Sequence, residues 1–238
     1  MVVITRPAGT AAALARRVRA GGGVPLLLPG LSLRGSHDPA LPAQMRAALK
    51  DDLLVFASPA AVRFAAKLAP LRSRAEVLAV GQGTARALRR HGLSACAPSR
   101  QDSEGLLALA AMQGLRGRRV ALVGAPGGRG LLREQLRARG ARLRELLVYR
   151  RVPPRLDRRH VEAVLGLPRS ARVLVSSAEA LHNLVGLLPA PALARLRVAV
   201  LVASSERLAR AARMAGFTRV VLARSALPVD LAEAAARR

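Results

Sequence analysis

One structural unit occurs twice in this chain, and this repetition limits the possible folds more than any other feature. Residues 120–151 have the pattern of an apolar strand, a glycine-rich loop, a helix and a strand of alternating polarity. Residues 2–31 have the same order. The turn residues of the two copies match at an offset of 119 residues: Pro7 with Pro126, Gly9 with Gly128 and Gly21 with Gly140. Because 119 is half of the 238 residues, we predict a diverged tandem duplication.

The remainder of the chain alternates short apolar strands with amphipathic helices. The further strands that we predict are Leu53 to Ala57, Val77 to Val80, Ala95 to Ala97, Val173 to Val175, Val198 to Val202 and Val220 to Leu222. Such alternation is typical of parallel sheets that are covered by helices on both faces. The predicted fold class is therefore α/β, with two parallel-sheet domains related by internal duplication.

The chain is strongly basic, with a formal net charge of +26. The first 119 residues hold 18 basic and 6 acidic residues, and the second half holds 22 and 8, so the halves carry +12 and +14. An evenly basic surface attracts polyanions, either nucleic acid or a metabolite with several carboxylates. Aromatic residues are only 2% of the chain, and nucleic-acid-binding motifs are lacking, so we do not expect specific nucleic-acid binding.

The cellular setting follows from cysteine content and hydropathy. Cys96 is the only cysteine, so an internal disulfide is excluded and a reducing compartment is favoured. The chain opens directly on a strand, and no apolar run approaches the ~18 residues of a membrane span. We expect a cytoplasmic protein without a signal peptide or membrane segment.

Small polar residues follow the predicted strands repeatedly. They are Thr5-Arg6, Ser58, residues 81–84, residues 124–129, Ser176-Ser177 and Ser204-Ser205. Each one alone is most simply a helix cap. At the carboxyl ends of parallel strands, however, six such groups would form a ring of donors that suits an anion with several carboxylates.

Other kinds of site are disfavoured. The loop at residues 124–130 lacks the Lys-Ser/Thr pair of a phosphate-binding loop, and Gly81-Gln82-Gly83 lacks a third glycine. The four histidines and the single cysteine have no spacing that suits a metal, so we predict no metal site. No grouping of serine, histidine and carboxylate suggests a hydrolase.

Tyr149 is the only tyrosine, and it lies just before the predicted linker at Pro153-Pro154. Its simplest interpretation is a residue at a strand end, with its ring in the core and its hydroxyl in water. Its position beside a linker also makes it a candidate functional residue.

Taken in order, several short motifs resemble uroporphyrinogen-III synthase along the whole chain. These are Ile4 to Pro7, Phe56 to Ser58 with Ala61-Val62, Val80-Gly81 with Thr84-Ala85, Ser103 to Leu107, and Val148 to Arg151. The resemblance implies two flavodoxin-like domains joined by two linkers, residues 1–33 plus 154–238 and residues 34–153, with the active site in the cleft between them. The linkers that we identify at residues 34–39 and 152–154 fall at these crossings.

The family's reaction is the cyclisation of hydroxymethylbilane, a linear tetrapyrrole, to uroporphyrinogen III, with loss of water and inversion of the last pyrrole ring. The resemblance implies that no cofactor is needed. It also implies that Tyr149, within Val148-Tyr149-Arg150-Arg151, is the catalytic acid that helps hydroxide to leave. The resemblance and the strand-end groups together give the predicted substrate-binding residues, which are Arg6, Ser58, Gly81, Thr84, Ser103, Arg129, Ser177 and Ser205.

Two positions depart from the family pattern. Ala60 stands where many relatives have asparagine, and Ser204-Ser205 replaces the Gly and Thr form of residues 80–84. On this interpretation the chain is a monomeric lyase that acts after hydroxymethylbilane synthase. The alternative is a noncatalytic two-domain module that binds a polyanionic ligand without changing it.

Overall fold

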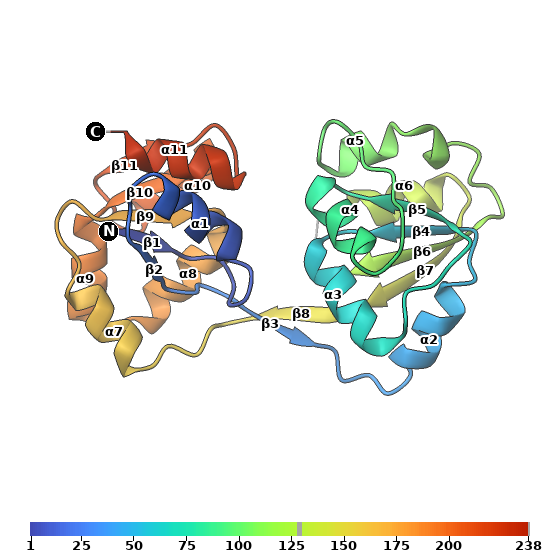
Figure 1. Cartoon of the computed structure of the whole chain (residues 1–238), viewed down its shortest axis with the longest axis horizontal. Coiled ribbons are helices and arrows are strands. Elements are labelled where there is room, and N and C mark those ends of the chain that lie inside the picture. The colour runs from blue at the N-terminus through green and yellow to red at the C-terminus, as the bar shows by residue number, and fades with distance from the viewer. Residues whose placement is uncertain (128–129, 238) are drawn as a thin grey trace. The chain divides into compact units, whose positions relative to one another are not determined.

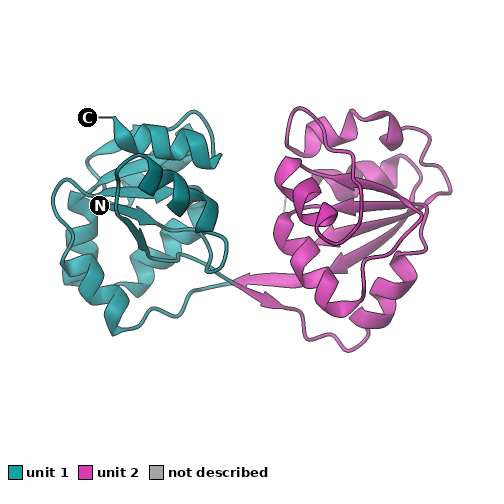
Figure 2. Cartoon of the chain, viewed as in Figure 1, with its two compact units in different colours: residues 1–32, 152–238 teal, residues 33–151 magenta. Residues whose placement is uncertain are grey.

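The computed structural model describes residues 1–127 and 130–237, and the chain divides into two compact units (Figure 2). Unit 1 consists of Met1–Ser32 and Val152–Arg238, and unit 2 consists of Leu33–Arg151. The chain therefore leaves unit 1 after its first strands, builds unit 2, and returns to complete unit 1. None of the helices in the described ranges is long and apolar enough to cross a membrane.

Unit 1 is a five-stranded sheet in the order β11-β10-β9-β1-β2 (Figure 1). Every strand pair in it is parallel. The strands are β1 (Val2–Ile4), β2 (Pro25–Leu27), β9 (Arg172–Val175), β10 (Val200–Ala203) and β11 (Val220–Leu222). Numbered along the chain within the unit, this order is 2-1-3-4-5, the order of flavodoxin-like sheets.

Helices cover both faces of the unit 1 sheet. They are α1 (Ala12–Ala20), α7 (Arg158–Leu165), α8 (Ala178–Leu187), α9 (Ala190–Val198), α10 (Glu206–Met214) and α11 (Pro228–Ala236). Neighbouring strand residues bury against opposite faces: Val3 packs with α7 to α10, whereas Ile4 packs with α1 and α11. Because both faces are buried, the strands are apolar at nearly every position.

Unit 2 contains a second parallel sheet, in the order β5-β4-β6-β7. Its strands are β4 (Leu53–Phe56), β5 (Glu76–Ala79), β6 (Arg119–Gly124) and β7 (Arg142–Leu147). Helices α2 (Leu41–Ala48), α3 (Pro59–Leu68) and α4 (Gln82–Arg89) cover one face. The other face carries α5 (Ser103–Leu107), the 3₁₀ turn η1 (Ala110–Met112) and α6 (Leu131–Ala138).

The two sheets have the same strand order when β6 is taken to correspond to β1 and β7 to β2. Strands β4 and β9 then correspond, and their ends lie 119 residues apart. The predicted α/β class with parallel sheets is confirmed, and the duplication itself stays a prediction. Two predicted strands differ by more than one residue: Val198 ends α9, so β10 begins only at Val200, and the predicted strand at residues 95–97 is reduced to one parallel bridge, Leu78 with Cys96.

The segment from Arg142 to Arg151, which the sequence predicts as one strand, is two strands. Strand β7 stays beside β6 until β6 ends, where the Val148 N–H donates to the Gly124 carbonyl. The chain then continues as β8 (Tyr149–Val152), which pairs with β3 (Ser32–Gly35) in a separate two-stranded sheet. The residues that the sequence predicts as linkers thus partly form strands, since these two passages hydrogen-bond to each other.

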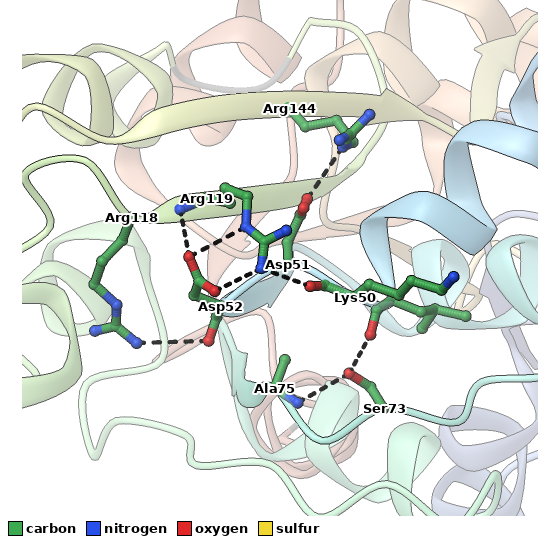
Figure 3. A network of polar contacts seen from close by, with 9 residues as sticks. Lys50, Asp51, Asp52, Ser73, Ala75, Arg118, Arg119 and Arg144 are labelled. Carbon is green, nitrogen blue, oxygen red and sulfur yellow. Dashed lines mark hydrogen bonds and ion pairs between the residues drawn. The ribbon is translucent and has the colours of Figure 1, made fainter.

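Ion pairs join the amino ends of β4, β6 and β7 (Figure 3). Asp52 accepts from the backbone N–H of Arg119 at 2.8 Å, and its other carboxylate oxygen accepts from the Arg119 guanidinium, also at 2.8 Å. Its neighbour Asp51 has a side chain only 2% exposed and accepts from Arg144 at 3.1 Å. This network fixes three strands at the edge of the sheet opposite to the one where parallel sheets bind ligands.

Asp52 should make the stability of the fold depend on acid. The hydrogen bond from the Arg119 guanidinium, followed by that from its backbone N–H, lowers the pKa of Asp52 from 3.8 to about 2. A carboxylate with a lowered pKa in the folded state stabilises above pH ~4, and this contribution is lost as the pH falls toward ~2. We expect Asp52→Asn to be less stable than the unmodified chain at pH 6, with the difference disappearing at pH ~2. Urea midpoints across this range test it, and parallel pH profiles for the two proteins would contradict it.

Candidate functional site

Ser58 lies at the carboxyl edge of the unit 2 sheet, between the end of β4 and the start of α3. Its Oγ accepts a hydrogen bond from the Ala61 N–H at 3.0 Å, so Ser58 is the N-cap of α3. Pro59 occupies the first turn, where its fixed φ suits a helix and its missing N–H costs nothing. The plain interpretation of Ser58 as a cap is therefore correct, but it does not describe every contact of this side chain.

Tyr149, the first residue of β8, is held at both ends of its side chain, by the N-cap of α3 and by a residue within that helix. Its Oη lies 3.1 Å from the Ser58 Oγ, and its ring stacks on Phe64 with centroids 5.4 Å apart and an interplanar angle of 14°. The residue is 8% exposed. Its ring is in the core, as the simple interpretation predicts, whereas its hydroxyl contacts Ser58.

The ring of Phe64 has two positively charged neighbours in addition to Tyr149. The Arg63 guanidinium carbon lies 4.9 Å from the ring centroid, and the Lys67 ammonium nitrogen lies 5.6 Å from it. Cations this close to an aromatic ring are attracted to its face. The sequence gives no signal for this arrangement, because Phe64 looks there like any apolar residue of an amphipathic helix.

The start of α4, at the end of β5, is already occupied in part. Gly81 is the N-cap, and Thr84 in the first turn is 3% exposed. The Gln82 N–H donates to the side-chain oxygen of Gln101 at 3.0 Å. A Cβ on Gly81 would lie 2.9 Å from that oxygen, so glycine lets Gln101 approach. Gln101 is a functional candidate that sequence reasoning misses, since its contact is formed across 19 residues.

Ser103 is the first residue of α5, and the cap is its neighbour Asp102. The Asp102 carboxylate accepts from the Gly105 N–H at 2.8 Å and from the Arg100 Nε at 2.6 Å. A Cβ on Gly105 would be 2.0 Å from the Arg100 carbonyl oxygen. The Ser-Glu-Gly-Leu motif thus has a structural explanation, and a carboxylate already occupies the helix start at which Ser103 lies.

The loop after β6 contains one more predicted substrate-binding residue, Arg129, which lies outside the described residues. On the side that is described, the Pro126 carbonyl accepts from the Arg151 guanidinium at 2.9 Å, which ties this loop to β8.

In unit 1 the predicted residues follow three adjacent strands. Ser177, after β9, caps α8 by accepting from the Ala180 N–H, and Ser205, after β10, caps α10 by accepting from the Leu208 N–H, each at 3.3 Å. In both cases the backbone N–H binds the oxygen, so the hydroxyl hydrogen can still be donated to a ligand.

Arg6 follows β1 and is the most unusual of the predicted residues. One of its terminal nitrogens donates to the Ala226 carbonyl at 2.6 Å, while its Nε is buried without a partner. Within residues 1–127 and 130–237, no carboxylate pairs with it. Burial lowers the pKa of the Arg6 guanidinium below its ordinary value, but arginine remains charged at neutral pH. A half-buried cation with a spare donor is suited to a carboxylate ligand.

The structure brings some of the predicted residues together. Ser58 and Tyr149 touch, and α3 packs against α4, which places Gly81 and Thr84 on the neighbouring helix. Arg6, Ser177 and Ser205 lie at the ends of strands that are neighbours in the unit 1 sheet. Each unit therefore presents hydroxyl and N–H donors at the carboxyl edge of its own sheet.

Comparison with known proteins places these features in one family. The family model described as uroporphyrinogen-III synthase HemD matches residues 12–233. The uroporphyrinogen-III synthase of Salmonella typhimurium is 34% identical over 94% of this chain and 95% of its own, and that of Escherichia coli is 32% identical over the same shares.

Two solved structures show the same fold. The uroporphyrinogen-III synthetase of Helicobacter pylori has a TM-score of 0.64 at 14% identity, and a mutant uroporphyrinogen III synthase of Thermus thermophilus has 0.57 at 23%. Each alignment covers 98% of this chain and 96% of the solved chain. With the family model spanning nearly all of its length, this chain belongs to the uroporphyrinogen-III synthase family.

Proposed function

We propose that this chain carries out the reaction of its family, the cyclisation of hydroxymethylbilane with loss of water, and that Tyr149 supplies the proton. Membership of the family is the observation that carries the activity, since the matched region covers residues 12–233. The position of Tyr149 supports its role. Its hydroxyl is fixed to a helix cap at the carboxyl edge of a parallel sheet, where such folds bind their ligands.

The bond changes define what the protein must do. The carbon–oxygen bond of the hydroxymethyl group breaks, and the leaving oxygen takes the Tyr149 proton to depart as water. The substituted carbon of the last ring attacks the carbon that lost the oxygen, and a spiro intermediate forms. The original bond from the substituted carbon to its bridge carbon then breaks, and the bridge carbon bonds to the free carbon of the same ring. The hydrogen on that free carbon leaves as a proton, which can restore the phenol. A general acid contributes ~10² to 10⁴-fold, and most of the remaining task is positioning.

The substrate carries eight carboxylates, and the chain offers it two kinds of donor. Arg6 has a buried Nε without a partner, and the capping serines 177 and 205 keep their hydroxyl hydrogens. The net charge of +26 draws a polyanion toward the protein. We propose that these groups hold carboxylates of the substrate.

Arg6→Gln should weaken substrate binding more than it slows turnover. Glutamine retains donors but loses the charge, so we expect KM to rise about tenfold, the lower range for a hydrogen bond to a charged group, with little change in kcat. Arg16→Gln, at an exposed position of α1, removes the same charge and is the matched control. Equal KM values for the two variants would show that only the overall charge matters.

The setting follows from the substrate. Hydroxymethylbilane is the product of hydroxymethylbilane synthase, so we propose that this chain takes the bilane from that enzyme. We further propose that it acts as a monomer in the cytoplasm.

Multiple turnover separates this function from a noncatalytic binding module. With hydroxymethylbilane in ~100-fold excess, we expect each protein molecule to convert many molecules of the bilane. Enzymes accelerate their reactions by many orders of magnitude. A binding module would retain at most one equivalent, and that result would exclude the proposed activity.

A further inference from the structure

The hydroxyl of Ser58 has two neighbours, and its oxygen and its hydrogen can each serve one of them. Its oxygen already accepts from the Ala61 N–H at 3.0 Å. Among the described residues, the only acceptor within hydrogen-bond distance of its hydrogen is the Tyr149 Oη at 3.1 Å. Either hydroxyl of this pair can donate, and when Ser58 donates, the Tyr149 hydrogen remains available to a substrate.

The same contact places the Tyr149 oxygen at the positive end of a helix. Ser58 caps α3, a helix of 10 residues, so the Tyr149 Oη lies one hydrogen bond from its N-terminus. Negative charge is stabilised there by the helix dipole and by the donor itself. A tyrosine that gives up its proton becomes negative at this atom.

We propose that Ser58 is a positioning residue that donates its hydroxyl hydrogen to the Tyr149 Oη and stabilises the charge that forms there as the phenol proton leaves. The inference rests on the proposed role of Tyr149 as the acid. In that step the Tyr149 O–H bond breaks, the proton goes to the departing oxygen of the substrate, and the electron pair stays on Oη. Ser58 keeps its own proton and shares it with that oxygen.

Helix α3 provides both halves of this arrangement. Ser58 at its cap holds the hydroxyl, and Phe64, six residues on, holds the ring at 5.4 Å. Two contacts to one rigid helix fix the direction of the phenol, which is what a preorganised acid requires.

Three substitutions of Ser58 separate the donor from the helix cap. Ser58→Thr keeps both functions, Ser58→Asp keeps a capping oxygen but has no hydrogen to donate, and Ser58→Ala loses both. We expect kcat to stay within about threefold for threonine and to fall about 10- to 100-fold for alanine and aspartate, the range of a hydrogen bond to a charged group. If aspartate retained the unmodified kcat, the cap alone would matter and the proposal would be wrong.

Tyrosine Raman spectra give a readout independent of activity. The chain has one tyrosine and no tryptophan, so the tyrosine doublet reports on Tyr149 alone. The intensity ratio of this doublet distinguishes a phenol oxygen that accepts a hydrogen bond from one that donates. We expect acceptor character in the unmodified protein and in Ser58→Thr, its loss in Ser58→Ala, and donor character in Ser58→Asp. Donor character in the unmodified protein would overturn the assignment.

Asp157→Ala is the matched control for loss of a cap, because Asp157 caps α7 in unit 1. It should lower the unfolding midpoint as a cap deletion does, with an unchanged tyrosine spectrum and kcat. Tyr149→Phe separates the two levels of the argument. If it lowers kcat while Ser58→Ala and Ser58→Asp do not, the acid role stands and the Ser58 proposal fails. If Tyr149→Phe keeps full kcat, the acid role itself fails.

Discussion

Tyr149→Phe should lower kcat by about 10² to 10⁴-fold, the contribution of a general acid, while KM stays within about threefold. Phenylalanine keeps the ring that stacks on Phe64 and removes only the hydroxyl that contacts Ser58. The substrate therefore meets a site of nearly the same shape, but the departing oxygen receives no proton from the protein. Steady-state kinetics of type III formation, corrected for spontaneous closure to type I, provides the measurement.

The division between kcat and KM decides what the hydroxyl does. An equal fall in kcat and kcat/KM indicates a contact formed only in the transition state, whereas a rise in KM alone would make the Tyr149 hydroxyl a substrate ligand. Unchanged values of both would remove Tyr149 from the reaction. The melting curve of the variant serves as the control for folding, since a loss of turnover with an unaltered melting curve is chemical rather than structural.

Gly105→Ala should destabilise the protein by about 3 kcal/mol, at the upper end of the usual cost of overpacking. The added Cβ would lie 2.0 Å from the Arg100 carbonyl oxygen and 2.9 Å from the carbon of that carbonyl. The backbone at residue 105 cannot easily move away from the Arg100 carbonyl. Asp102 caps the helix through the Gly105 N–H, and the following Leu106 is fully buried. Urea unfolding measures the free-energy change directly.

Gly186→Ala is the matched control, with the opposite sign. Gly186 lies near the end of α8, is exposed, and nothing lies within 4 Å of the position where its Cβ would be. Alanine there should stabilise by about 0.5 to 1 kcal/mol, because it removes the conformational entropy of a helical glycine. A Gly105→Ala protein as stable as the unmodified one would contradict the close contact with Arg100.

The fold could be predicted from the sequence because its main signal is local. Two-sided burial makes strands such as β4 and β10 apolar throughout, and glycines and prolines mark the turns between elements. The capping roles of Ser58, Ser177 and Ser205 are equally local, since each oxygen reaches an N–H only three residues further on.

The contacts that define the candidate site could not be predicted, because they join distant parts of the chain. Ser58 and Tyr149 are 91 residues apart, and the break at Val148 between β7 and β8 depends on where the neighbouring strand β6 ends. Gln101 is polar and exposed in sequence terms, yet it occupies the first N–H of α4. Such contacts depend on the tertiary packing around the sheet, and they leave no periodic pattern in the sequence.

The isomer of the product tests the central claim most directly. Released hydroxymethylbilane closes unaided to uroporphyrinogen I, whereas closure with inversion of the last ring requires a protein that holds the chain. With enzymatically generated hydroxymethylbilane, followed by oxidation and separation of the porphyrin isomers, we expect the unmodified protein to yield the type III isomer. Formation of type I alone, at the rate seen without protein, would contradict the account.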